Sequence, residues 1–195
     1  MPLDVIHSTC AAISPLDSAA VAAAVERQAR LTKPAGSMGR LEDLSHQLAG
    51  VYAVCPPPVP APVTVVVMAG DHGVHAQGVS PWPQEVTVQM VANVAAGGAV
   101  VNALARQVGA AVEVVDVGVA APLLFTEGVV QRRVRAGTRD FTVEPALTRD
   151  EAVEAVAVGI DLADERRAAG DRLLVTGDLG IGNTTASAAL VAAFT

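Results

Sequence analysis

The residues best suited to chemistry form a glycine-rich turn near the end of the chain, within Leu173–Thr185. A short apolar run is followed there by Gly177, Gly180 and Gly182, and then by an Ala-rich segment of high helix propensity. Glycines let backbone N–H groups approach a ligand closely, and a helix N-terminus attracts anions. The pattern indicates a phosphate site, although an ordinary tight turn between a strand and a helix has the same pattern.

Asp178 lies inside this turn and is an unusual neighbour for a phosphate, because a carboxylate repels it. It fits better beside ribose hydroxyls, as a group that orients the N–H groups of the turn, or as a partner for positive charge on a sugar. After the turn, Asn183 or Thr184 is expected to cap the helix through a side-chain oxygen.

A polar loop between a predicted strand and a predicted helix carries the other candidate groups. Asp71, His72 and His75 could bind a metal ion, but such loop residues more often make supporting hydrogen bonds, so we predict no metal site. Ser80 lacks the GxSxG turn of a nucleophilic serine. Gln89 could hydrogen-bond a ring nitrogen or could simply lie on a solvated helix turn.

These residues need a scaffold, and apolar periodicity predicts one. Nearly continuous apolar, β-branched runs predict buried strands, and apolar residues at helical spacing predict helices between them. Strands that alternate with helices indicate an α/β fold with a largely parallel sheet. The expected strands are 63–69, 111–119, 129–135 and one that begins at Leu173, and the expected helices between them are 84–96, 99–108 and 149–169.

The last long helix should begin at a capping box formed by Thr148 and Glu151. Its expected buried face consists of four apolar residues: Val153, Val156, Ala157 and Ile160.

The first 62 residues are expected to form a small helical appendage, with helices at 16–31 and 40–54. The proline-rich segment Cys55–Pro62 (CPPPVPAP) cannot continue the second helix and has the stiffness of a linker. We therefore place a domain boundary after Pro62, with the main α/β domain at 63–195.

Composition limits the classes of function. The chain has 195 residues, of which 51% are hydrophobic, and its net charge of −7 opposes a nucleic-acid partner. Cys10 and Cys55 lie far apart without metal-ligand spacing, as expected for free thiols in a reducing compartment. We find no signal peptide, and the apolar stretches are interrupted short of a membrane span. The sequence therefore predicts a cytoplasmic protein without a membrane partner.

Four motifs together are far more specific than the glycine turn alone. On these motifs the chain resembles the nicotinate-nucleotide:dimethylbenzimidazole phosphoribosyltransferases, which build the lower-ligand nucleotide of cobalamin. The resemblance extends over nearly the whole chain. The motifs are LTKPAGSMGRLEDL (31–44), AGDHGV with GVSPWPQEVTVQMV (69–91), GTRDFTVEPALTRDEA (137–152) and GDLGIGNTT (177–185).

The resemblance implies an activity and an architecture. The enzyme would move the 5-phosphoribosyl group from nicotinate mononucleotide to 5,6-dimethylbenzimidazole and release α-ribazole 5′-phosphate and nicotinate. It would need no cofactor and would act as a homodimer. The implied fold is a Rossmann-like parallel sheet with helices on both faces and a small helical domain.

The resemblance also implies roles for individual residues. Ser80 and Gln89 match positions that line the base pocket. Asp178 matches a supporting carboxylate where the family usually has Glu, so its reach is shorter by one methylene. The positions of the phosphate loop are Gly180, Gly182, Asn183, Thr184 and Thr185.

The chain departs from the family in length. Family members are typically much longer, and the implied catalytic base is a Glu beyond Thr195. We therefore expect a main domain that is incomplete at its C-terminus, no catalytic base in this chain, and little transferase activity from the chain alone. One alternative is a truncated, non-catalytic fragment that binds a nucleotide or dimerises. A dinucleotide-binding oxidoreductase is a poorer fit, because GDLGIGNTT lacks the GxGxxG spacing.

Overall fold

The computed structural model describes residues 2–123 and 127–195. The chain divides into two compact units, one formed by Met1–Thr9 with Ala61–Thr195 and the other by Cys10–Pro60. Each unit is described below by itself. The expected domain boundary after Pro62 stays a prediction.

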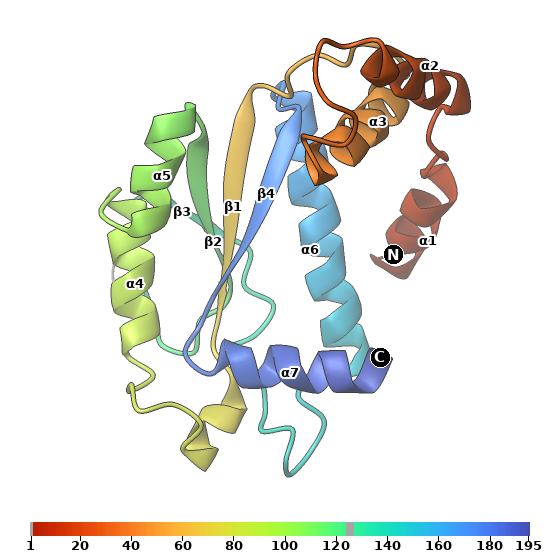
Figure 1. Cartoon of the computed structure of the whole chain (residues 1–195). Coiled ribbons are helices and arrows are strands. Elements are labelled where there is room, and N and C mark those ends of the chain that lie inside the picture. The colour runs from red at the N-terminus through yellow and green to blue at the C-terminus, as the bar shows by residue number, and fades with distance from the viewer. Residues whose placement is uncertain (1, 124–126) are drawn as a thin grey trace. The chain divides into compact units, whose positions relative to one another are not determined.

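The larger unit is built on a sheet of four parallel strands in the order β3-β2-β1-β4 (Figure 1). The apolar run of β1 occupies the centre, where both neighbours hydrogen-bond to it. This arrangement confirms the expected α/β fold with a parallel sheet. The strands are β1 (Val63–Gly70), β2 (Ala111–Gly118), β3 (Val129–Gln131) and β4 (Leu173–Leu179).

Helices cover both faces of this sheet, as expected (Figure 1). Val65 and Val67 of β1 pack with residues of α4 (Val86–Ala95) and α5 (Val100–Val108). The intervening Val66 points to the other face. There it packs with residues of α6 (Arg149–Ala168). Alternate residues of one strand thus belong to two separate cores.

The capping box of α6 is present, with Thr148 Oγ1 accepting from the Glu151 N–H at 3.2 Å and Glu151 Oε2 accepting from the Thr148 N–H at 2.7 Å. Of the expected buried face, Ala157 is buried but Val156 is 52% exposed. The helix buries Leu162 instead, and Val158 packs one turn before it. Val156 lies two residues, or about 200°, from Val158 around the helix and therefore faces away.

The segment Val86–Val108 is apolar and long enough, by composition, for a membrane-spanning helix. In the structure it forms α4 and α5, which are separated at Gly97, where φ is 78°. Val91 and Val94 are fully or almost fully buried against the sheet. The segment therefore serves as cover for the sheet.

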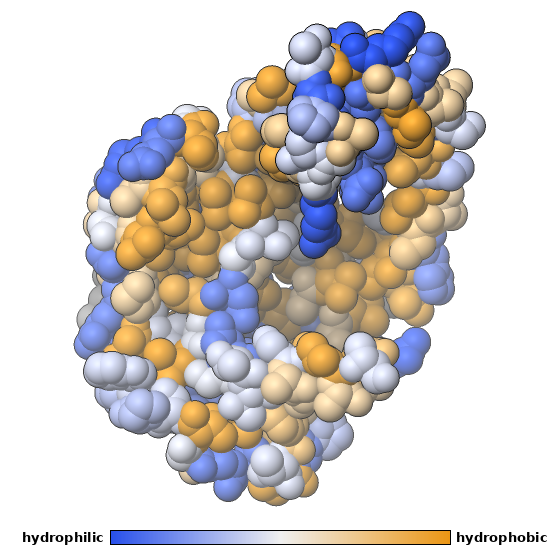
Figure 2. Space-filling view, viewed as in Figure 1, coloured by the Kyte–Doolittle hydropathy of each residue, from blue (hydrophilic) through white to orange (hydrophobic). Residues whose placement is uncertain are grey.

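One stripe of α5 does not pack as the periodicity suggests. Val100, Leu104 and Val108 are 60–75% exposed. The same helix buries Ala105 and Asn102, and the Asn102 side chain bonds the backbone at Ala99 and Val94. Hydrophobic surface is visible on the side of the larger unit where α5 lies, at the left of the view (Figure 1 and Figure 2).

The smaller unit contains α2 (Ser18–Ala29) and α3 (Arg40–Tyr52), close to the expected helices. Its core is formed by Ala20, Ala24 and Ala49. The helix α1 (Pro2–Ala12), most of which belongs to the larger unit, was not predicted. None of its described residues is buried.

Candidate functional site

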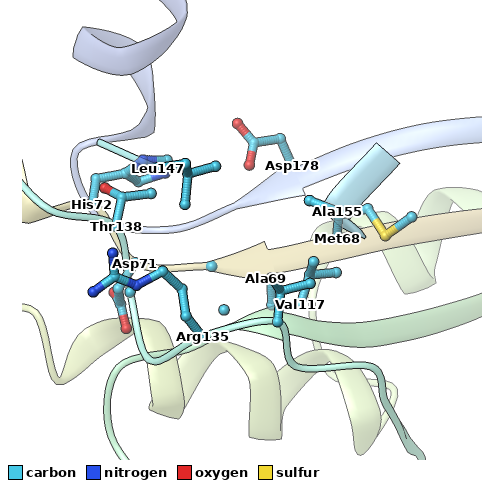
Figure 3. A pocket seen from close by; sticks show the side chains of 14 residues that line it. Met68, Ala69, Asp71, His72, Val117, Arg135, Thr138, Leu147, Ala155 and Asp178 are labelled. Carbon is cyan, nitrogen blue, oxygen red and sulfur yellow. The ribbon is translucent and has the colours of Figure 1, made fainter. Parts of the chain in front are cut away.

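The candidate site lies where parallel strands end together. The last residues of β1 and β2, Gly70 and Gly118, are paired in the sheet, and the turn after β4 lies against Gly70. A cavity of about 270 Å³ opens at this edge (Figure 3). Ligands of open α/β sheets bind outside the carboxyl ends of the strands.

The turn between β4 and α7 (Asn183–Phe194) depends on two glycines. A Cβ atom on Gly180 would lie 1.8 Å from the carbonyl oxygen of Gly70, so only glycine lets the turn approach the end of β1. Gly182 has a φ of 93° and is the N-cap of α7. The turn therefore packs against the end of β1 through backbone atoms alone.

The expected cap at Asn183 or Thr184 is wrong. Gly182 takes the N-cap position, and α7 has no side-chain cap hydrogen bond. Asn183 is already the first helical residue, and its Nδ2 donates to Asp178 Oδ2 at 3.1 Å. Two N–H groups at this helix end donate within the turn, Asn183 to the Gly180 carbonyl and Thr185 to the Gly182 carbonyl, both at 3.1 Å. The dipole of α7 nevertheless favours an anion at its N-terminus.

The turn is also held by a hydrogen bond to helix α4. Ile181 N–H donates to Thr87 Oγ1 at 3.1 Å, and Thr87 is 1% exposed on α4. This contact holds the middle of the turn, and the Asn183–Asp178 bond links the start of α7 to β4. Among the roles expected for Asp178, orienting the turn is the one supported by a contact.

Asp71 joins three segments at the same edge and is 2% exposed. Its N–H donates to the Gly118 carbonyl at 2.9 Å, and its Oδ2 accepts from the Ala120 N–H at 2.8 Å. Its carbonyl accepts from the Thr138 N–H at 2.9 Å. Asp71 thus ties the end of β1 to the end of β2 and to the connection before α6.

His72 lines the cavity and also contacts the glycine turn. Its Cδ2 lies 3.3 Å from the place where a Cβ of Gly180 would be, and its Cβ lies 3.8 Å from the same place on Gly182. Burial lowers the pKa of the His72 imidazole, although the charges of Asp178 and Asp71 act in the opposite direction. Burial therefore favours the neutral form of the ring.

The three residues considered as metal ligands act separately. His75 Nε2 hydrogen-bonds the Trp82 carbonyl at 2.8 Å, although its Cβ lies near Gly182, as that of His72 does. Within residues 2–123 and 127–195, no group of three or more His, Cys, Asp or Glu side chains could hold a metal ion.

The motif GTRDFTVEPALTRDEA forms a rigid frame around the cavity. Glu151 accepts from two guanidinium nitrogens of Arg139, at 2.7 and 3.1 Å, and also caps α6. These bonds lower the pKa of Glu151 to about 2. Asp140 accepts from the N–H and hydroxyl of Thr142 and from Gln77 Nε2 at 2.6 Å. The frame fixes the connection from which Thr138 and Leu147 reach the cavity.

The predicted base-pocket residues Ser80 and Gln89 do not line the cavity. Ser80 Oγ accepts from the Trp82 N–H at 3.2 Å, and Gln89 is exposed on α4. Val79, next to Ser80, lies 3.7 Å from the Cβ position of Gly182, so this loop adjoins the glycine turn. Their base-binding role stays a prediction.

Sequence reasoning missed the cavity wall, which includes Arg135 and Thr138. Arg135 stands in a segment without regular structure, and no local pattern marks it. Its position beside Asp71 in the cavity lining depends on a separation of 64 residues along the chain.

Comparison with known proteins places the chain in a family. A family model described as phosphoribosyltransferase matches residues 13–195. The chain is 59% identical to the nicotinate-nucleotide–dimethylbenzimidazole phosphoribosyltransferase of Salinispora tropica, over 97% of this chain and 56% of that protein. It is 53% identical to the protein of the same name from Roseiflexus sp., over 99% and 54%.

A solved structure agrees with the fold. The crystal structure of the enzyme of this name from Thermus thermophilus superposes with a TM-score of 0.86 at 45% identity. The match covers 91% of this chain and 54% of that one, and the chain spans about half the length of the curated relatives it matches. By the extent of the family match and by this common fold, the chain belongs to the phosphoribosyltransferase family.

Proposed function

We propose that the chain binds nicotinate mononucleotide for transfer of its 5-phosphoribosyl group to 5,6-dimethylbenzimidazole, with α-ribazole 5′-phosphate and nicotinate as products. The names of its relatives supply the reaction. The observation that carries the proposal is the N-terminus of α7, which has no side-chain cap and lies beside a cavity at the carboxyl edge of the sheet.

The 5-phosphate is assigned to the glycine turn. The backbone around Gly180 and Gly182, with Asn183, Thr184 and Thr185, would surround it with N–H and hydroxyl donors. The helix dipole adds a favourable field for an anion at this end. A phosphate held there fixes the distance from the anomeric carbon to the attacking base.

The chemistry requires charge stabilisation at the sugar. Transfer of a glycosyl group passes through an oxocarbenium-like state, which nearby carboxylates stabilise. Asp178 is the carboxylate at the turn and lines the cavity. Ser80 and Gln89 are proposed to contact the incoming base, and the general base is proposed to be a Glu outside this chain.

The remaining proposals follow from the family and the composition. We infer a homodimer, located in the cytoplasm, that uses no resident cofactor and contacts neither nucleic acid nor membrane. The net charge of −7 supports the absence of a nucleic-acid partner. A non-catalytic fragment that binds a nucleotide or dimerises is the second candidate, because the chain covers about half of its relatives.

Calorimetric titration with nicotinate mononucleotide tests the proposal. Thr184→Glu places a carboxylate in the first turn of α7, where it competes with phosphate, and should weaken binding about tenfold or more, equivalent to about 1.4 kcal/mol. Ser187→Glu adds the same charge at an exposed position one turn later and should change affinity about twofold or less. Equal effects of the two variants would refute the phosphate assignment.

A turnover assay tests whether the chain catalyses the transfer by itself. We expect nucleotide binding with little formation of α-ribazole 5′-phosphate by the chain alone, because the implied base is not in it. Robust turnover would overturn this expectation and assign the base role to a carboxylate of this chain, such as Asp178, Glu85 or Asp71.

A further inference from the structure

The cavity beside the glycine turn holds charged groups that phosphate binding does not use. Arg135, Asp71, His72 and Asp178 line it from different segments of the chain (Figure 3). Apolar side chains supply much of the remaining wall. They include Met68, Val117, Val134 and Leu147.

The Arg135 guanidinium is incompletely partnered. Within the described residues, its Nε and Nη1 are buried without a hydrogen-bond partner. Its Nη1 lies 3.7 Å from Glu151 Oε2, which is beyond hydrogen-bond length. Glu151 already accepts two bonds from Arg139 and one from the Thr148 N–H. Arg135 therefore keeps positive charge and N–H donors that no neighbouring carboxylate uses in full.

Two other polar side chains of the cavity also have a buried atom without a hydrogen-bond partner. Asp71 Oδ1 and His72 Nε2 are buried and accept or donate no hydrogen bond in the part of the chain that the structure describes. Unpaired buried polar groups cost free energy unless a ligand or ordered water completes them. The cavity thus presents positive and negative charge on an otherwise mainly apolar wall.

We propose that this cavity receives the pyridine ring of nicotinate mononucleotide and that Arg135 binds the ring carboxylate, which selects the acid over its amide. This inference rests on the proposed function. A cavity of about 270 Å³ has room for one aromatic ring. The ring carries a pyridinium charge, which suits Asp71 and Asp178, and a carboxylate, which suits a guanidinium. His72 contacts both the cavity and the glycine turn, so ring and phosphate of one nucleotide lie on either side of it.

The pairing of Arg135 with the ring carboxylate also favours the transfer step. When the bond between the anomeric carbon and the ring nitrogen breaks, its electron pair stays on the nitrogen and the pyridinium charge disappears. The anomeric carbon bonds the unprotonated benzimidazole nitrogen, and the N–H proton of the benzimidazole passes to the general base, proposed above to be a Glu outside this chain. The leaving ring changes from zero net charge to −1, so a nearby guanidinium attracts it more strongly after departure than before. Arg135 is therefore a specificity residue whose charge also assists leaving.

The test compares nicotinate mononucleotide with nicotinamide mononucleotide by calorimetry. The unmodified chain should bind the acid about tenfold more tightly than the amide, equivalent to about 1.4 kcal/mol. Arg135→Met should reduce this ratio to about one, mainly by weakening the acid, and Arg135→Lys should leave a reduced ratio, since Lys keeps the charge but lacks the planar fork. Arg132→Met is the matched control, because Arg132 pairs with Glu165 outside the cavity, and it should leave the ratio unchanged.

The outcomes separate this inference from the proposed function. An unchanged ratio in folded Arg135→Met protein overturns the inference, and if that variant does not fold, an unchanged ratio in Arg135→Lys does so. Ribose 5-phosphate serves as a probe of the glycine turn alone. If it binds the unmodified chain and is lost in Thr184→Glu while the ratio does not depend on Arg135, the inference fails and the proposed function stands. If neither nucleotide nor ribose 5-phosphate binds, both fail.

Discussion

The glycine turn and the frame around Glu151 both adjoin the cavity at the carboxyl edge of the sheet, but they differ in how fully side chains pair their polar groups. In the frame, Glu151 accepts bonds from Arg139 and Thr148, and Asp140 accepts three more. In the turn, the N-terminus of α7 has no side-chain cap. Both segments are long motifs in the sequence.

This difference in hydrogen bonding indicates that the two regions have different roles. Polar groups that bond one another stabilise a conformation and leave little for a ligand. Polar groups that the fold leaves open cost stability and are retained where a ligand completes them. We therefore interpret the frame as support for the site, and the turn and cavity as the surface that meets the ligand.

The largest effect should come from Gly180→Ala. Its Cβ would meet the Gly70 carbonyl oxygen, which is backbone and cannot move aside alone, so the turn must shift. We expect a marked fall in the melting temperature and loss of nucleotide binding. Gly159→Ala in α6 is the control, since open space surrounds its Cβ position and alanine should stabilise the helix by roughly 0.5–1 kcal/mol. Equal melting temperatures of the two variants would contradict the close approach.

A smaller effect is expected from Thr87→Val. The change removes the hydroxyl that accepts from the Ile181 N–H but nearly keeps the side-chain shape. A buried donor left unpaired costs about 1–3 kcal/mol, which should appear in the free energy of unfolding. Affinity for nicotinate mononucleotide should fall too, because the turn loses its anchor. Thr87→Ser keeps the hydroxyl and should restore the affinity; failure to do so would show that the bond does not anchor the turn.

The smallest effect should be the pH dependence that Glu151 adds to stability. Its pKa of about 2 lies below the ordinary value of 4.5, so the folded state holds the charged form more strongly than the unfolded state. The contribution is complete above about pH 4.5 and disappears as pH falls toward about 2. Unfolding in urea from about pH 6 to about pH 3 should therefore show a weaker pH dependence for Glu151→Gln.

The Glu151→Gln variant also tests the comparison between the glycine turn and the frame around Glu151. Glu151→Gln should leave nucleotide affinity at neutral pH almost unchanged, since the frame supports the site without contacting the ligand. Glu154→Gln, an exposed position on the same helix, should retain the full pH dependence. A loss of nucleotide affinity in Glu151→Gln without loss of stability would place the frame in the binding surface.

Much of the fold followed from the sequence because its signals are local. The β-branched run of β1 and the capping box at Thr148 depend on neighbouring residues, and both appear where the pattern put them. The cap of α7 was predicted wrongly because the conformation of Gly182 moves the start of the helix by one residue. The exposed stripe of α5 also shows that spacing identifies an apolar face without telling whether the rest of the fold covers it.

The sequence by itself determined the parallel α/β architecture, the family and the presence of a glycine turn between strand and helix. Each of these features depends on residues that are close together in the chain or on motifs that are continuous stretches of sequence. Only the tertiary structure decided that the turn rests on Gly70, that Thr87 anchors it from α4, and that Arg135 faces the same cavity as Asp71. The physical reason is that parallel strands bring segments that are distant in the sequence to one edge of the sheet. The order of residues along the chain does not show which side chains lack a hydrogen-bond partner once these segments meet.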